Sequence, residues 1–584
     1  MDYGLIAEAY EKIERTSKRL QMTDYLVDLI KRTSEEAIGK VVYLTQGKLY
    51  PDYMGIEIGI AEKLAIRAVA LAADVGEDRV KKSYRETGDL GETIQRLLEE
   101  KAHHVEKPLT VEEVYETLDK MAKTMGPGTI EMKMNLLSSL LKKASPKEAK
   151  YIIRTVTGKL RLGIADMTML DALAIVYAGG KHFRKEVERA YNISSDLGEV
   201  ASTIAKDGLK GIRRFGVHVG KPIRPMLAER LPSAQEILDK MGGSCAVEYK
   251  YDGERIQIHK RGDEISLFSR RLENITHQYP DVLELGRKNI RAKEAIIECE
   301  CVAVDLDTGE MKPFQELMHR RRKYGIEKAM EEYPVSIFAF DVLYVDGKDL
   351  TLCSYPQRRK ALEKIVRISD RVGLTTYLVT SNVEELEKFF EKAIEDGCEG
   401  LVCKSTGPHA VYQAGARGWL WIKYKREYKS EMTDTVDLVV VGAFHGRGKR
   451  AGTYGALLLA AYDPERDIFL TVTKCGTGFT DKDLAELPDK LEKYRISHKH
   501  PRVDSLIEAD VWFTPGLVLE TIGAEITLSP VHTCAWNKIR KESGLAIRFP
   551  RFTGNYRSDK ASEDATTVQE IVEMYQGRLR KVSA

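Results

Sequence analysis

The pattern of the chain changes near residue 220, and this change limits what the chain can fold into. Before it, apolar residues recur at the spacing of one helix face, as at Val111, Val114, Tyr115, Leu118 and Met121. After it, glycine and proline interrupt the chain, and short runs of strand-forming residues follow one another. A single hydrophobic core does not organise 584 residues, so we expect several domains of different architecture.

Two helix starts can be assigned in the first part. Thr110 is followed three residues later by Glu113, which is a capping box in front of the helical run. The segment SPKE, which begins at Ser145, combines an N-cap with a proline at the first helical position and a glutamate at the third. No residue pattern typical of chemistry occurs here, so this part is expected to be a scaffold or a binding domain.

The second and third parts are predicted to contain strands. In the second part, strands are expected at 246–249, 255–259, 265–268, 295–304 and 335–345, with helices at 356–367 and 383–396. In the third part, short strands separated by glycine-rich turns are expected at 437–443, 456–461, 469–473, 510–513 and 517–522. We therefore expect an all-α domain over 1–215, an α+β domain over 216–430 and a small β-barrel of the oligonucleotide-binding type over 431–584.

Composition and charge exclude some classes of protein. With 43% hydrophobic and 31% charged residues the chain is globular and not disordered. It has no apolar run long enough to cross a bilayer and no signal-peptide pattern, so we expect a cytoplasmic protein without membrane contact. The eight cysteines form no C-x-x-C pair, which favours buried thiols over a zinc site. The net charge of +2 is uninformative, but basic residues cluster at Lys142/Lys143/Lys147/Lys150, Lys210/Arg213/Arg214, Arg320/Arg321/Arg322/Lys323, Arg447/Lys449/Arg450 and Lys538/Arg540/Lys541.

Each basic cluster alone is most simply a solvated surface. Several of them in different segments make contact with nucleic-acid phosphates plausible. Two glycine-rich segments do not form nucleotide-binding loops. The first, at 216–222, has three residues where a P-loop needs four and ends in Pro222 where a serine or threonine belongs. The second, at 446–452, is one residue too long for the dinucleotide fingerprint and precedes a strand.

The segment EYKYDGER at 248–255 is the most informative one for chemistry. Lys250 ends an apolar strand, and Asp252-Gly253 turns the chain into the next strand, so the amine is expected at a strand end facing a cleft. An amine attacks phosphorus only in its unprotonated form, which burial or nearby cations such as Arg255, Lys423 and Lys425 favour. A single K-x-D-G match is more often an ordinary hairpin lysine.

The match is not isolated. Ser269-Arg270, Glu298-Cys299-Glu300, Phe340-Asp341, Glu399-Gly400 and Trp421-Ile422-Lys423-Tyr424-Lys425 follow in order. Together with the lysine motif they resemble the serial motifs of the covalent nucleotidyltransferases, which comprise DNA ligases, RNA ligases and mRNA capping enzymes. AFD at 339–341, GRGKR at 446–450 and RFPRF at 548–552 narrow the resemblance to ATP-dependent DNA ligases of the archaeal and eukaryotic replicative type, over nearly the whole chain.

This resemblance implies a role for each matching position. Lys250 would be the nucleophile, Glu248 the acceptor for the adenine amino group, and Phe340 the aromatic that stacks on adenine; a core phenylalanine is the alternative. Glu300 would bind the ribose, and Glu300 and Glu399 would hold Mg²⁺, or Mn²⁺ in its place. The residues implied to neutralise phosphates are Arg255, Arg270, Arg417, Lys423 and Lys425. Arg548, Arg551 and the RSDK run at 557–560 resemble the final motif, which closes over ATP.

The resemblance also implies the partners. They are ATP and nicked duplex DNA, which the helical domain helps to encircle, and the enzyme is expected to be a monomer acting in DNA replication, repair and recombination. Archaeal ligases often carry a sliding-clamp motif, a glutamine with paired aromatics. The segment at 100–107 has neither, which puts clamp binding in doubt. An RNA ligase or capping-type enzyme, and a catalytically dead nucleic-acid-binding protein, are the alternatives. Use of ADP, GTP or NAD in place of ATP stays open.

Overall fold

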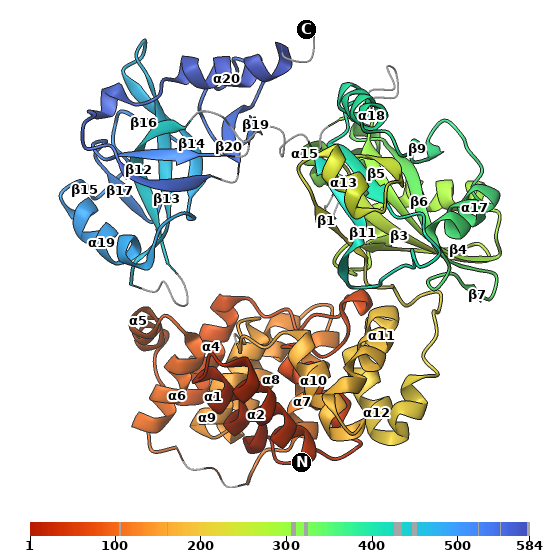
Figure 1. The fold of residues 1–584 in the computed structure, drawn as a ribbon. Coiled ribbons are helices and arrows are strands. Elements are labelled where there is room, and N and C mark those ends of the chain that lie inside the picture. The colour runs from red at the N-terminus through yellow and green to blue at the C-terminus, as the bar shows by residue number, and fades with distance from the viewer. Residues whose placement is uncertain are drawn as a thin grey trace. The chain divides into compact units, whose positions relative to one another are not determined.

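The computed structural model covers residues 1–584. It describes all of them except 104, 106, 161, 305–310, 313, 321–324, 426–434, 447–451, 524, 549 and 581–584, and the side chains of 315, 395 and 577–580. The chain divides into two compact units, 1–424 and 425–584, which are described separately (Figure 1). Within the described part of the chain, no helix is long and apolar enough to span a membrane.

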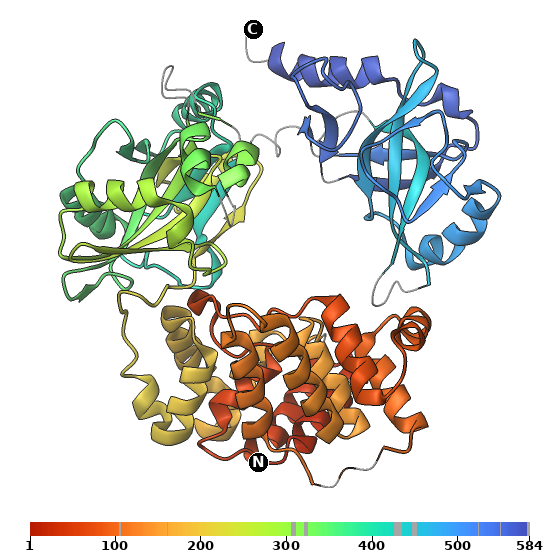
Figure 2. The same cartoon turned by 180° about the vertical axis from the view of Figure 1, so that it is seen from behind.

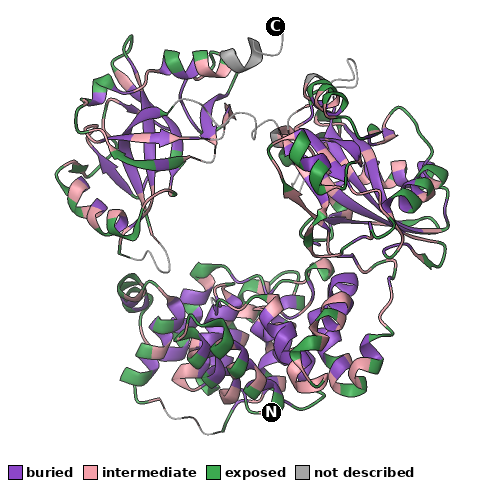
Figure 3. Ribbon diagram, viewed as in Figure 1, coloured by how far each residue is buried: buried purple, intermediate pink, exposed green. Residues whose placement is uncertain are grey.

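The first half of unit 1 is helical, as predicted. Buried aliphatic side chains from these helices form one continuous core (purple in Figure 3). The helices are α1 (Gly4–Glu14), α2 (Arg19–Lys31), α3 (Ile38–Thr45), α4 (Glu62–Ala73), α5 (Glu77–Thr87), α6 (Leu90–Glu100), α7 (Val111–Lys123), α8 (Thr129–Lys143), α9 (Pro146–Val156), α10 (Asp166–Tyr177), α11 (Arg184–Ser194) and α12 (Leu197–Ile212).

Both predicted helix starts are confirmed. Helix α7 begins after Thr110, whose hydroxyl accepts from the Glu113 N–H, while the Glu113 carboxylate accepts from the Thr110 N–H. The same reciprocal pair joins Ser145 and Glu148 at the start of α9, with a proline in the first turn. The apolar face predicted for α7 is buried. These capping bonds satisfy backbone donors that a helix start leaves unpaired.

The second half of unit 1 contains two sheets. The five-stranded sheet has the order β1 (Leu227–Arg230), β11 (Arg417–Lys425), β10 (Gly400–Lys404), β2 (Cys245–Lys250) and β9 (Tyr377–Thr380). The six-stranded sheet has the order β4 (Glu264–Ser269), β3 (Glu254–Arg261), β5 (Glu294–Ala303), β6 (Val335–Val345) and β7 (Lys348–Asp349), with β8 (Val372–Leu374) on β6. All five strands predicted in this part are confirmed.

Helices cover the outer face of each sheet (Figures 1 and 2). Helices α13 (Ala234–Lys240) and α18 (Val383–Glu395) share a core with β2 and β10 of the five-stranded sheet. Helices α14 (Pro280–Asn289) and α17 (Tyr355–Ile365) share a core with β3, β5 and β6 of the six-stranded sheet. The short helices α15 (Phe314–Leu317) and α16 (Ile326–Glu332) complete this part. Inner-face residues of both sheets meet in a third cluster, which contains Phe340 and Trp421.

The segment between the helices and the sheets is held along β3. Side chains on one face of β3 bind its main chain: the Gly220 N–H donates to His259 Nδ1 at 2.9 Å, and Gln257 exchanges two hydrogen bonds with the main chain of Ile223, at 2.8 and 3.1 Å. Burial lowers the pKa of His259 to about 3, so its imidazole is neutral and can accept this bond. The segment 216–226, which includes this glycine-rich stretch, therefore lies across the six-stranded sheet, and we call it the strap.

Unit 2 is a curled sheet with helices. Its eight-stranded sheet contains β12 (Val436–His445), β13 (Tyr454–Asp463), β14 (Ile468–Cys475), β15 (Arg495–Ile496), β16 (Val503–Asp504), β17 (Val511–Phe513), β18 (Val518–Ile522) and β21 (Arg551–Tyr556). Strands β19 (Glu525–Ser529) and β20 (Gly544–Arg548) form a separate pair, and the helices are α19 (Asp481–Glu492) and α20 (Val568–Arg580). One edge of β12 pairs with β13, whereas the other pairs first with β18 and then with β17, so the sheet bends around a core.

Candidate active site

Lys250 lies at the end of β2, where the chain crosses from one sheet to the other. Its Nζ is 2.7 Å from Oε2 of Glu399, and the two side chains are 26% and 28% exposed. The Glu399 N–H also donates to the Lys250 carbonyl at 2.8 Å, just before β10 begins. The crossing needs a glycine, because a Cβ on Gly253 would lie 2.3 Å from the carbonyl oxygen of Cys301 on β5. The K-x-D-G motif thus fixes a lysine between two sheets.

Two further carboxylates surround the Lys250–Glu399 pair. Burial raises the pKa of Asp252 to about 6, and the Glu399 carboxylate adds to the rise. Burial also raises the pKa of Glu300 to about 7, against the attraction of Lys250 and Arg255 and with repulsion from Glu399 and Asp252. The site holds more carboxylates than the lysine alone balances, which is an environment that favours a cation. Nevertheless, no three His, Cys, Asp or Glu side chains within the described ranges are arranged to hold a metal ion.

Glu248 occupies the buried floor of the site. It shares a face of β2 with Lys250, while Tyr249 between them packs in the opposite core. Its carboxylate accepts from the Tyr355 hydroxyl and pairs with Lys404 Nζ at 2.7 Å. Lys404 also donates to the Phe340 carbonyl at 3.1 Å, and burial lowers the pKa of its ammonium group. The pairing keeps a charged acceptor in an apolar pocket.

A bulge in β6 turns Phe340 into the space between the sheets. Ala339 pairs with Cys299 and Asp341 with Glu298, so Phe340 has no partner on β5. Phe340 is 9% exposed, and its ring packs edge-on against Trp421, with centroids 6.2 Å apart. Bulges of this kind commonly redirect a side chain beside a functional site.

Arg255 is committed to protein groups. Its Nη2 binds both carboxylate oxygens of Glu298, at 2.9 and 2.7 Å, and Nη1 donates to the Met226 carbonyl at 2.9 Å. The Tyr412 hydroxyl donates to the same carboxylate at 2.9 Å. The guanidinium lies 5.3 Å from the centre of the Phe340 ring. A phosphate role for Arg255 stays a prediction. In the structure its guanidinium binds Glu298 and the Met226 carbonyl and packs near the Phe340 ring.

The other predicted cations lie on β11 and in the turn after β4. Lys423 and Lys425 flank the buried Tyr424 on β11, so both point to the inner face that carries Trp421, and both are half-buried. Arg417 is exposed at the far end of the same strand. Arg270 is exposed in the turn that follows β4. The structure therefore brings the two lysines to the inner face and leaves the two arginines at its margins.

Comparisons with known proteins identify the family. Three family models match: "DNA ligase N terminus" over 2–174, "ATP dependent DNA ligase domain" over 225–425 and "ATP dependent DNA ligase C terminal region" over 450–560. DNA ligase 2 of Thermofilum pendens is 58% identical over 99% of this chain and 98% of its own length. The chain belongs to the ATP-dependent DNA ligases.

Other relatives agree. The DNA ligase of Staphylothermus marinus is 55% identical over 100% of both chains, and a probable DNA ligase of Aquifex aeolicus is 55% identical over 98% of both. A solved structure titled Pmar-Lig_PreS3 is similar in fold, with a TM-score of 0.53 at 16% identity over 94% of this chain and 99% of that one. The protein is therefore an ATP-dependent DNA ligase with a nucleotidyltransferase middle domain, as the motif order indicated.

The structure adds site residues that the sequence analysis of this ligase did not assign. Lys404 and Tyr355 hold Glu248, and Glu298 with Tyr412 holds Arg255. One signal could have found Lys404, because it is a lone charge in the apolar run GLVCK of β10. Glu298 lies in the Glu298-Cys299-Glu300 motif, although no role was assigned to it, whereas nothing local marks Tyr355 and Tyr412.

In unit 2, three basic residues of the predicted final motif pair with carboxylates. Arg557 Nη1 and Lys560 Nζ both lie 2.7 Å from Oδ2 of Asp437 on β12. Arg548 at the end of β20 is 3.4 Å from Glu525 on β19. The basic cluster predicted at 447–450 lies outside the described residues.

Proposed function

We propose that this ligase seals nicks in duplex DNA through an AMP–lysine intermediate on Lys250. In the first step Nζ attacks the α-phosphorus of ATP; a P–N bond forms and pyrophosphate leaves. In the second, an oxygen of the 5′-phosphate at the nick attacks the same phosphorus and the P–N bond breaks. In the third, the 3′-hydroxyl attacks the 5′-phosphate and AMP leaves. The observation that carries the proposal is the Lys250–Glu399 pair at the crossing between the sheets.

The amine must lose a proton before it attacks. Oε2 of Glu399, 2.7 Å from Nζ, is within reach of that proton. The Glu248 carboxylate is proposed to accept from the adenine amino group, and Lys404 supports this role by balancing its charge. Phe340 would contact the base, with Glu300 toward the ribose. Lys423 and Lys425 would offset phosphate charge from β11, helped at the margins by Arg270 and Arg417.

A divalent cation fits the acidic surroundings of Lys250. Glu399 lies beside Lys250, and burial raises the pKa of Asp252 to about 6 and of Glu300 to about 7, with repulsion between these carboxylates adding to the rise. We propose that Glu300 and Glu399 hold Mg²⁺, or Mn²⁺ in its place. The bound ion would neutralise charge on the phosphates.

One experiment tests the central proposal. The enzyme is incubated with α-³²P-ATP and Mg²⁺, freed of nucleotide, and then chased with nicked DNA. Label should enter the protein, move to the 5′ end of the nick, and finally appear as free AMP while the nick closes. Label that stays on the protein when nicked DNA is added would contradict the proposal. The same assay with a nicked RNA duplex distinguishes an RNA ligase.

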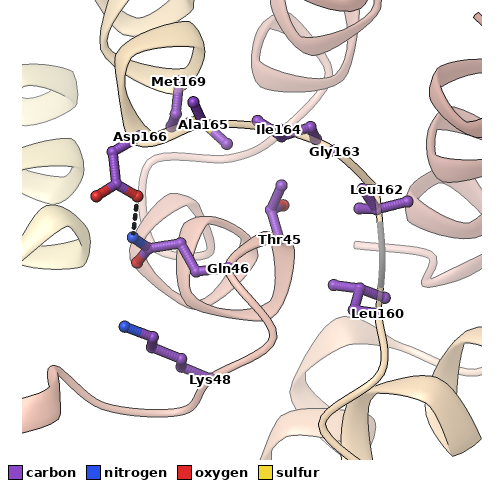
Figure 4. Close-up of a pocket in the computed structure, with 10 residues that line it drawn as sticks. All are labelled: Thr45, Gln46, Lys48, Leu160, Leu162, Gly163, Ile164, Ala165, Asp166 and Met169. Atoms are coloured by element: carbon purple, nitrogen blue, oxygen red, sulfur yellow. Dashed lines mark hydrogen bonds between the residues drawn. The ribbon is translucent and has the colours of Figure 1, made fainter. Parts of the chain in front are cut away.

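We also propose that the helical residues 1–215 grip duplex DNA, and the match to the N-terminal ligase model supports this role. A cavity of about 290 Å³ opens between α3 and the segment leading into α10; it is lined by Lys48 and Asp166 together with apolar side chains (Figure 4).

Unit 2 is proposed to be an oligonucleotide-binding barrel, since β12 bends between three partner strands. The three-domain division at 215 and 430, a monomeric cytoplasmic enzyme, and roles in replication, repair and recombination are proposals of the same kind.

Deleting residues 1–215 should separate DNA binding from adenylation. The truncated enzyme keeps both sheets, so it should take up label from α-³²P-ATP at close to the full-length rate. Its affinity for nicked DNA should fall at least about tenfold, and its binding should depend less steeply on salt because fewer phosphates are contacted. A gel-shift titration at several salt concentrations measures both. Unchanged nick affinity would show that these helices serve another purpose.

A further inference from the structure

The helices and the catalytic sheets of unit 1 meet around one residue of the strap. Arg224 Nη1 donates to the Tyr191 hydroxyl at 2.6 Å, and its guanidinium lies 4.5 Å from the centre of that ring. Its main chain is held from both sides: the Arg224 N–H donates to the Asn192 carbonyl at 2.8 Å, and its carbonyl accepts from the Gly415 N–H at 2.9 Å. Arg224 thus binds α11 with its side chain and backbone, and through its backbone it binds the turn that precedes β11.

The two sides are packed too closely for any side chain at Gly415. A Cβ there would lie 2.4 Å from Oδ1 of Asn192, and the residue has φ +68°, a conformation that favours glycine. Asn192 is itself buried, with 4% of its surface exposed. The contact is therefore tightly fitted and not a loose approach of two surfaces.

On the helical side, the contact of Arg224 continues to the cavity. The Tyr191 hydroxyl donates to Oδ2 of Asp166 at 2.7 Å, and Arg224 Nη2 lies 3.5 Å from the same oxygen. Oδ1 of Asp166 accepts from Gln46 at 2.9 Å, the bond drawn in Figure 4. Asp166 and Gln46 both line the cavity. A rearrangement of the residues that line the cavity would therefore change the contacts of Arg224 with Tyr191 and Asp166.

On the catalytic side, the contact leads into β11. The Leu227 N–H donates to the Ala416 carbonyl at 2.9 Å, and β11 begins at the next residue. Ile193, next to Asn192 on α11, packs in the same cluster as Phe340 and Trp421. The position of α11 is thus linked by direct packing to the strand that carries Lys423 and Lys425.

We propose that Arg224 is a positioning residue that couples DNA held by the helices to the catalytic strand β11. This inference rests on the proposed DNA-binding role of residues 1–215. Arg224 needs to touch neither ATP nor DNA. It should matter little for adenylation, which is proposed to use the two sheets and the C-terminal motif, or for binding a nick, which the helices are proposed to provide. It should matter when both must be aligned, in the transfer of AMP from the enzyme to the 5′-phosphate.

The test uses full-length variants and three measurements. Arg224→Ala and Tyr191→Phe remove the two ends of the hydrogen bond, and Tyr191→Phe keeps the ring. Arg213→Ala is the matched control, since Arg213 is an exposed arginine that pairs with Glu186 of α11, the helix that also carries Tyr191. Three quantities are compared. They are labelling by α-³²P-ATP, gel-shift affinity for nicked DNA without ATP, and the single-turnover rate of AMP transfer from pre-labelled enzyme to the nick.

The expected result is a split between the measurements. For Arg224→Ala, labelling and nick affinity should stay within about twofold of the wild type, and transfer should slow about tenfold or more, as expected when a charged hydrogen bond is lost. Tyr191→Phe should show the same split at smaller size, and Arg213→Ala should show none. Transfer at the wild-type rate in both variants would overturn the inference, and so would an equal loss in all three measurements.

Two controls keep the outcomes separate. If Arg224→Ala fails to fold by circular dichroism, Tyr191→Phe decides, because it deletes one oxygen only. A failure of the proposed function would appear as absent labelling of the wild-type enzyme, or as unchanged nick affinity after deletion of 1–215. Loss of coupling would leave both of those intact.

Discussion

Replacing Lys250 with alanine is expected to abolish labelling of the enzyme by α-³²P-ATP, with a loss of at least about 10⁴-fold, as when a covalent nucleophile is removed. The Lys250 side chain lies against Glu399 at the crossing between the sheets, and K-x-D-G occurs once in the sequence, at 250–253. Lys250→Arg should fail equally, since a guanidinium stays protonated and is no nucleophile.

The control for this prediction is a lysine on the surface of the same part of the chain. Lys288 on α14 pairs with Glu284 at 3.5 Å and is well exposed, so Lys288→Ala should label normally. Denaturing gels after a timed incubation report the covalent adduct directly. Wild-type labelling of Lys250→Ala would remove the assignment of the nucleophile and leave the family membership unaffected.

Lys560→Ala and Glu399→Ala are expected to fail at different steps. The family resemblance assigns Lys560, with Arg548 and Arg551, to contact with the triphosphate during the first step alone. Loss of that cation should slow self-adenylation about 100-fold, a typical cost of deleting one transition-state contact, and should leave the sealing of a nick already carrying 5′-AMP within about threefold of the wild type. Glu399→Ala should impair both, because its proposed metal-binding role persists through all steps.

Single-turnover sealing of a pre-adenylated nick without ATP separates these outcomes. Lys482→Ala provides the control, since Lys482 is an exposed lysine of unit 2 that lies 3.9 Å from Glu486. Lys560 and Arg557 share Asp437, so Asp437→Asn tests whether that ion pair restrains them. Equal loss of sealing in Lys560→Ala and Glu399→Ala would show that the C-terminal motif does not act in the first step only.

Much of the local structure could be predicted from the sequence because its causes are local. The capping boxes at Thr110 and Ser145 involve residues three positions apart, and both were found where predicted. The alternation along β2 sets Glu248 and Lys250 on one face, which follows from the two-residue period of a strand. The motif order led to the correct family. The helix starts and the face of β2 need no knowledge of the fold, since each is decided within a few residues.

The partners of the charged residues were decided by the tertiary structure. The phosphate role of Arg255 stays a prediction, but only the fold shows that its guanidinium binds Glu298 and the Met226 carbonyl. Arg320 was predicted in a basic surface cluster, yet it is fully buried and pairs with Asp281 at 2.7 Å. A guanidinium can bind either a phosphate or a carboxylate. The residues next to an arginine in the sequence therefore do not tell which of the two it binds in the fold.

The same limit explains the features that the sequence left unassigned. The sequence by itself determined the family, the helix starts at Thr110 and Ser145, the five strands predicted between 246 and 345, and the lysine that we propose as the nucleophile. Only the fold set Lys404 against Glu248 and redirected Phe340 through a bulge. Only the fold brought Gly415 against Asn192, two residues more than two hundred positions apart. Burial free energy and close packing act between such distant residues, and a chain read in order does not contain their distances.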